Sequence, residues 1–174
     1  MKTSTAFAGG LAGACALTVV HELVRKADSQ APRQDKLGMQ VLAKTLHKAN
    51  KPVPSQKQLR NWALAGDIVL NSLYYSLAGA GKPKNVFLRG VILGAASGLG
   101  TLFLPKYMGL DNSYSNRSSK TKVLSVALYV IGGLAAAAAI KALTKSDKED
   151  QKEREQRTDE YMGYETTAPL DGYW

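Results

Sequence analysis

The chain has 174 residues, of which 45% are hydrophobic, with a net charge of +9 and a mean hydropathy of −0.18. A single cysteine, Cys15, excludes a disulfide within the chain, and the clustering of the apolar residues argues against an ordinary soluble domain. These residues fall into four blocks of about 20 residues each, the length that crosses a bilayer core of about 30 Å. The blocks cover residues 6–24, 62–80, 86–104 and 123–143.

We therefore expect an all-α, polytopic membrane protein. Residues 1–143 would form a domain of four transmembrane helices plus a short interfacial helix, and residues 144–174 a polar tail. The alternative is a soluble bundle rich in Ala and Gly. Soluble bundle helices carry a polar face, which these blocks barely show, whereas Gly is common in membrane helices that pack closely. The composition thus favours the membrane.

The charge is unevenly distributed along the chain. Residues from Lys145 onward carry a net charge of −4, and the preceding part carries +13. The basic residues border the apolar blocks and form no nucleic-acid-binding motif. We therefore expect them to meet an anionic membrane surface rather than nucleic acid.

The first block begins with small residues and ends in a motif that resembles part of a metalloprotease site. Gly9 and Gly13 have the four-residue spacing that lets two helices approach closely, so we expect this block to be retained as a packed span. The segment His21-Glu22-Leu23-Val24-Arg25 begins like HExxH, but Arg25 stands where the second histidine would bind zinc. We expect no metal or cofactor, and polar residues near the membrane surface are the simpler interpretation.

The basic loop over residues 25–61 predicts a short amphipathic helix. Asp35 is placed to cap a helix over residues 36–50, whose apolar positions are flanked by lysines. This composition suits a helix lying on the membrane surface, and a helix packed on the end of the bundle is the alternative. Ser55 and Gln58 predict the start of the next helix.

The second block carries polar residues at helical spacing, among them Asp67, Asn71 and Tyr74. Only residues 81–85 separate it from the third block, which predicts an antiparallel hairpin of neighbouring helices. The third and fourth blocks are rich in small residues, and we expect tight helix contacts, within the chain or with another copy, at Gly90, Gly94, Gly98 and Gly132.

The tail combines mixed charges at helical spacing with an aromatic end. Taken alone, it predicts a frayed helix followed by disorder. We expect a partner to bind it through its aromatic residues, Tyr161, Tyr164, Tyr173 and Trp174.

Helix geometry places several polar residues at one depth. At 1.5 Å per residue, His21 lies about 6 Å below Arg25, where the first helix leaves the membrane, and Asp67 about 7 Å below Trp62. We therefore predict an intramembrane polar cluster made of His21, Glu22, Asp67, Asn71, Tyr74 and Tyr129. Such a cluster is either a proton or cation site, or a set of hydrogen bonds that fixes the register of the helices.

The distribution of Lys and Arg predicts an orientation. The loop over residues 25–61 holds nine of them, so the positive-inside rule predicts a cytoplasmic loop and termini that face outward.

The runs HELVRK, APRQDKLGMQVLAK and GDIVLNSLYYSLAGAGK together resemble small bacterial inner-membrane proteins with no assigned activity. The resemblance is one of general pattern over residues 6–107, excludes the tail and implies no catalytic residues. It implies a location in the bacterial inner membrane.

The leading hypothesis for function is a non-catalytic accessory or structural subunit of a larger membrane complex. Its partners would be the lipid bilayer and other membrane protein subunits, or further copies of the chain. A small proton- or cation-linked transporter or channel that uses Asp67 with His21 or Glu22 is the alternative. The third hypothesis, a lipid-modifying enzyme, rests only on the presence of His21 and Glu22 near an interfacial helix.

Overall fold

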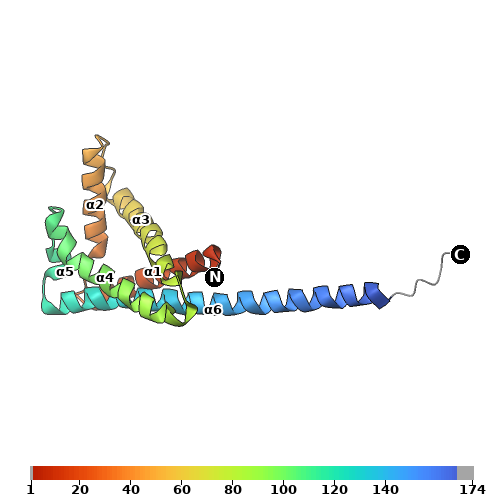
Figure 1. Cartoon of the computed structure of the whole chain (residues 1–174). Coiled ribbons are helices and arrows are strands. Elements are labelled where there is room, and N and C mark those ends of the chain that lie inside the picture. Colours follow the sequence, from red (N-terminus) through yellow and green to blue (C-terminus); the bar gives the residue numbers. More distant parts are fainter. Residues whose placement is uncertain (1, 168–174) are drawn as a thin grey trace.

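The computed structural model describes the backbone of residues 2–167 and, except at 160 and 163–167, their side chains. This described part is all helical and contains no strand. Figure 1 shows the elements in chain order: α1 (Thr3–Ala27), α2 (Gln34–Lys48), α3 (Gln56–Ser76), the 3₁₀ turns η1 (Leu77–Gly79) and η2 (Pro83–Asn85), α4 (Val86–Tyr107), α5 (Ser113–Asn116) and α6 (Ser119–Thr167).

Three helical segments of the described chain are long and apolar enough to cross a membrane: Thr3–Ala27, Pro83–Tyr107 and Ser119–Asp159. The protein is therefore a helical, membrane-embedded protein. The second predicted block lies in α3, which is not among the three. Its hydropathy is lowered by the polar first turns that begin at Gln56 and by Asp67 and Asn71.

α6 is the centre of the bundle, and α1 and α4 pack along it in the opposite direction (Figure 1). On α1, Thr5 contacts Asp147 and Gly13 lies against Ala136, so the start of α1 meets the far part of α6. On α4, Gly98 lies against Val126. Because α1 and α4 both run antiparallel to α6, they run parallel to each other.

The predicted glycine contacts form within the chain. A Cβ atom added at Gly94 would lie 2.6 Å from the carbonyl oxygen of Tyr129, and one at Gly98 would lie 2.7 Å from Cα of Val126. Gly90 meets Gly133 backbone to backbone. The small residues therefore let α4 approach α6 to backbone contact. Gly9 and Gly13 do the same for α1, and Gly132 makes room for Leu17 and Tyr75.

α3 packs mainly on α1 and stands inclined to the layer formed by α1, α4 and α6 (Figure 1). One face of its last turns is buried, with Ser72 beside Gly10 of α1 and Tyr75 fully buried. The expected hairpin of neighbouring helices is wrong along most of its length, because the glycine face of α4 packs on α6 and leaves little contact with α3. The bond from the Tyr74 hydroxyl to the carbonyl of Leu93, at 3.1 Å, is one of the few links between them.

α2 packs on the end of the bundle, where it contacts α3 and α5. Asp35 is not the helix cap that the sequence predicts: it lies in the first turn of α2 and binds Arg33, the residue that precedes the helix. The predicted start of α3 is correct, since Ser55 precedes it and donates its backbone N–H to the side chain of Gln58 at 3.3 Å.

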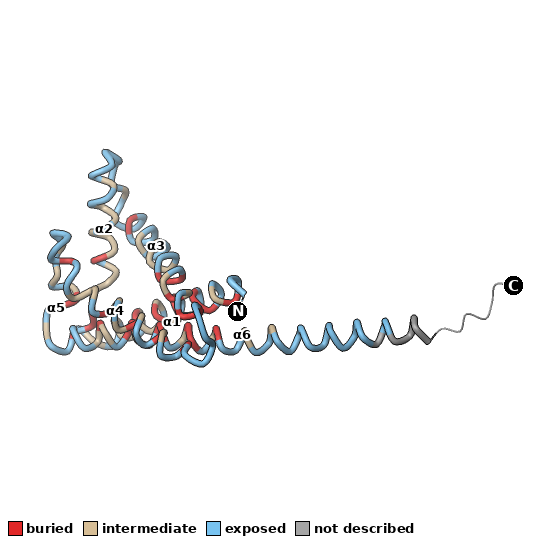
Figure 2. The backbone as a smooth tube through the Cα atoms, in the orientation of Figure 1, coloured by how far each residue is buried: buried red, intermediate tan, exposed pale blue. Residues whose placement is uncertain are grey.

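The tail continues α6 as helix through Thr167 instead of fraying at the end of the bundle. With 49 residues, α6 is about 74 Å long at 1.5 Å per residue. Every residue from Lys148 to Asp159 is exposed, and this part of α6 is pale blue in Figure 2. We call residues 148–167, the part of α6 that extends beyond the bundle, the arm. Of the predicted aromatic tail residues, Tyr161 is exposed on the arm, the Tyr164 side chain is not described, and Tyr173 and Trp174 lie outside the described residues.

Candidate functional site

The end of the bundle at which α1 ends and α3 and α6 begin, here called the loop end, contains a cavity of about 50 Å³. Four helices contribute to it, α1, α2, α3 and α6. Its polar lining residues are Thr18, His21, Glu22, Gln34, Asp35, Arg60, Asp67 and Tyr129. Leu17 and Leu64 supply part of the apolar wall.

Helical spacing explains which side chains reach this cavity. Leu17 and His21 are four residues apart on α1, so both point to the same side. Arg60 and Asp67 are seven residues apart on α3, which also places them on one face. Tyr129 comes from the buried core of α6, where it packs with Leu17.

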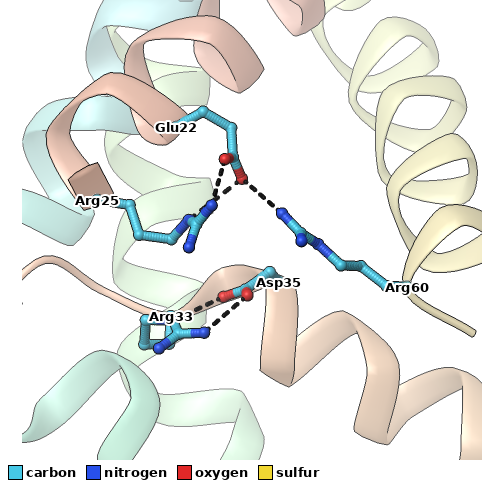
Figure 3. Close-up of polar contacts among 5 residues, drawn as sticks. All are labelled: Glu22, Arg25, Arg33, Asp35 and Arg60. Carbon is cyan, nitrogen blue, oxygen red and sulfur yellow. Dashed lines mark hydrogen bonds and ion pairs between the residues drawn. The ribbon is translucent and has the colours of Figure 1, made fainter. Parts of the chain in front are cut away.

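Two ionic groups surround the cavity, and Figure 3 shows both. Glu22 accepts hydrogen bonds from Arg25 at 2.5 and 3.3 Å and from Arg60 at 3.5 Å, so it ties α1 to α3. Asp35 accepts two hydrogen bonds from Arg33, each at 3.0 Å. Arg25, which occupies the place of the second histidine of an HExxH motif, therefore holds the carboxylate of Glu22.

At the start of α2, the positive charge of Arg33 and the negative charge of Asp35 form an ion pair, and each stabilises the charged form of the other. Burial raises the pKa of the Asp35 carboxyl, but the paired hydrogen bonds and the positive charge of Arg33 outweigh it, so this pKa lies below its ordinary value. Hydrogen bonding to Asp35 raises the pKa of Arg33. Arg33 also donates its backbone N–H to the carbonyl of Tyr114 at 2.8 Å, which ties the start of α2 to α5.

Two buried nitrogen atoms at the cavity have no hydrogen-bond partner within the described residues, Nε2 of His21 and Nε2 of Gln34. The His21 residue is only 8% exposed. An unpartnered buried polar atom costs about 1–3 kcal/mol, so both nitrogens are suited to bind something that enters the cavity. A cavity of about 50 Å³ has room for a water molecule or a small ion.

The structure brings four members of the predicted cluster to this cavity: His21, Glu22, Asp67 and Tyr129. The other two, Asn71 and Tyr74, do not line it. Asn71 donates its side-chain amide to the backbone carbonyl of Asp67 at 3.0 Å, and Tyr74 bonds to α4.

Sequence reasoning missed the contributions of the basic loop to the site. Arg33, Gln34 and Asp35 flank or line the cavity because α2 folds back over the loop end, which no spacing within the loop predicts. Arg60 carried a usable signal, since it lies two turns before Asp67 on the same face. Tyr75 was also missed: it is fully buried and donates its hydroxyl to the carbonyl of Tyr129 at 2.8 Å.

The chemistry available at the cavity is that of charged and hydrogen-bonding side chains. Within residues 2–167, no three His, Cys, Asp or Glu side chains lie together as a metal-binding set. Glu22 and Asp35 are held by arginines, whereas no arginine or lysine forms an ion pair with Asp67 in the described part of the chain. The site can therefore fix helices, and it can hold a proton or small cation at His21 and Asp67.

Comparison of the chain with protein-family models, with curated proteins and with solved structures gave no match.

Proposed function

We propose that the protein is a non-catalytic accessory subunit of a membrane complex, and that its arm binds a protein partner outside the bilayer. The observation that carries this proposal is the length and exposure of the arm. It extends α6 beyond Asp147, which binds Lys2 and Thr5 at the start of α1. From Lys148 to Thr167 it would reach about 30 Å.

The charges of the arm favour a protein partner over lipid. Between Lys148 and Asp159 there are four basic and five acidic side chains, so the arm carries almost no net charge that an anionic leaflet would attract. A helix that is polar on all sides gains no stability from burying an apolar face. Docking against a partner would supply the contacts that such a helix lacks.

The ionic groups at the loop end support a structural role for the bundle. Glu22 links α1 to Arg60 of α3, and the backbone of Arg33 links α2 to α5. The carboxylates of Glu22 and Asp35 are thus engaged by arginines and are less suited to act as general bases.

We infer that α3 is a fourth, inclined crossing. α1 and α4 run in the same direction, so the chain between them must return to the side on which α1 starts. α3 is the long helix described on that return path, and it exposes apolar side chains suited to lipid, among them Leu70 and Leu73. Both termini would then face one side, with the loop over residues 25–61 on the cytoplasmic side of a bacterial inner membrane.

The test is extraction in mild detergent followed by affinity purification of the tagged full-length chain. A matched variant, Gln156→Pro, breaks the arm; its ring clashes with the carbonyl of Lys152, so the contacts of Asp147 stay in place. We expect a stoichiometric protein that copurifies with the wild type and is lost from the variant. A wild-type chain that migrates only as a monomer would refute the proposal.

A proton or small cation site at the loop-end cavity is the second candidate. It is supported by the unpartnered Nε2 of His21 and by Asp67 in the same cavity. Asp67→Asn should abolish proton or cation flux into liposomes, while Asp111→Asn, an exposed carboxylate outside the cavity, should leave it unchanged. Equal flux in both variants, or none in the wild type, would remove this candidate.

A further inference from the structure

The other end of the bundle, here called the arm end, carries a basic groove of about 300 Å³ between the start of α4 and α6. It lies far from the loop-end cavity along α6. Its basic lining residues are Lys84, Arg89, Lys141, Lys145 and Lys148.

Two of these five cations are free to bind a ligand. Arg89 is fixed by hydrogen bonds to the carbonyls of Ala78 and Lys82, at 2.7 and 3.1 Å. Lys141 lies over the Phe87 ring, 5.4 Å from its centroid, and Lys145 forms an exposed ion pair with Glu149. Lys84 and Lys148 bind no other side chain among the described residues, and both are exposed.

The acidic residues close to the groove are already engaged. Asp147 accepts hydrogen bonds from Lys2 at 2.9 Å and from Thr5 at 2.6 Å, and these bonds tie α6 to the start of α1. Glu149 faces Lys145 at 3.6 Å. The groove therefore presents an excess of positive charge to an incoming anion.

The groove lies where the apolar block of α4 begins, at residue 86, and that of α6 ends, at residue 143. This is the level of lipid headgroups for helices that span the bilayer. Its floor includes the apolar side chains of Val86 and Ile140. Phe87 and Leu143, close by on the same two helices, are exposed and available to acyl chains. A basic rim above an apolar wall matches a phospholipid better than a free anion.

We propose that the arm-end groove binds an anionic phospholipid, with Lys84 and Lys148 contacting its phosphate and headgroup. Lys141 and Lys145 add positive charge around it. The apolar faces of α4 and α6 receive the acyl chains. The site would anchor the base of the arm at the membrane surface, and it does not depend on the arm having a protein partner.

Native mass spectrometry of the full-length protein in neutral detergent tests the proposal. The probes are dioleoyl phosphatidylglycerol, dioleoyl phosphatidylcholine and inorganic phosphate. A lysine near an anionic surface contributes a factor of about five to binding, so Lys84→Gln combined with Lys148→Gln should weaken phosphatidylglycerol binding about thirtyfold. Lys48→Gln combined with Lys51→Gln, two exposed lysines at the loop end, removes the same charge and should change binding little.

Preference for phosphatidylglycerol over phosphatidylcholine, lost only in the arm-end double variant, is the expected result. All four lysines are exposed, so the variants should fold as the wild type does, and far-UV circular dichroism checks this. Wild-type affinity in the arm-end variant, an equal loss in the loop-end control, or inorganic phosphate that displaces the lipid would each overturn the proposal.

Discussion

Replacement of Gly94 by alanine should force α4 away from α6. The added Cβ would lie 2.6 Å from the carbonyl oxygen of Tyr129 and 2.6 Å from Cα of Val130, whereas ordinary contacts begin at 3.4 Å. Both neighbours are backbone atoms of a helix and cannot rotate away, so the two helices must separate locally by nearly 1 Å. Overpacking of this kind costs about 1–3 kcal/mol.

The matched control is Gly100→Ala on the same helix, where the added Cβ would meet only the end of Leu104, at 3.5 Å. Both substitutions gain the same helix propensity, so the difference in unfolding free energy between them isolates the clash. Reversible unfolding in mixed micelles with increasing SDS, followed by circular dichroism, measures that difference. Equal stability of the two variants would refute the packing of α4 on α6 described above.

Three further changes probe the core and the loop end. Tyr75→Phe removes a buried hydrogen bond to α6 and should cost about 0.5–1.5 kcal/mol of unfolding free energy in the same assay. Because the folded pKa of Asp35 is depressed, its pairing with Arg33 stabilises the protein above the ordinary carboxyl pKa of 3.8 and loses this effect as pH falls through the folded value. Asp35→Asn should therefore be less stable than the wild type at pH 6 and match it in strong acid; a stability difference that does not change with pH would contradict this. A double-mutant cycle on Glu22 and Arg60, both partly exposed, should give a coupling energy of no more than about 1 kcal/mol, and a much larger value would show that this pair is buried.

The helical class and three of the spans follow from the sequence because they depend on local apolar length. Blocks 6–24, 86–104 and 123–143 lie within helices that are long and apolar enough to cross a membrane. The glycine spacing also predicts the packing, since Gly90, Gly94 and Gly98 on α4 leave room for the backbone of α6, as Gly9 and Gly13 do on α1. Spacing could not tell whether the partner helix belongs to this chain, because the same surface suits either.

The arrangement of α2 and α3 could not be predicted, because it depends on contacts between distant segments. A five-residue turn after the second block indicates neighbouring helices, yet α4 finds a better-fitting surface on α6. Asp35 looks like a helix cap from its position, but Arg33 two residues earlier competes for the carboxylate. The depth of His21 and Asp67 was predictable from helix rise, whereas the approach of Gln34 to the same cavity was not.

Site-specific photo-cross-linking along the arm tests the central claim most directly. A photoreactive amino acid would replace each residue from Glu149 to Asp159 in turn, in intact membranes, with Ile92 on the exposed surface of α4 as the lipid-facing control. If one face of the arm docks on a partner, adducts of a single mass should form at positions three and four residues apart. No protein adduct should form at Ile92. Adducts of the mass of a second copy would identify the partner as this chain. Uniformly weak labelling with no helical period would contradict the claim that the arm binds a protein.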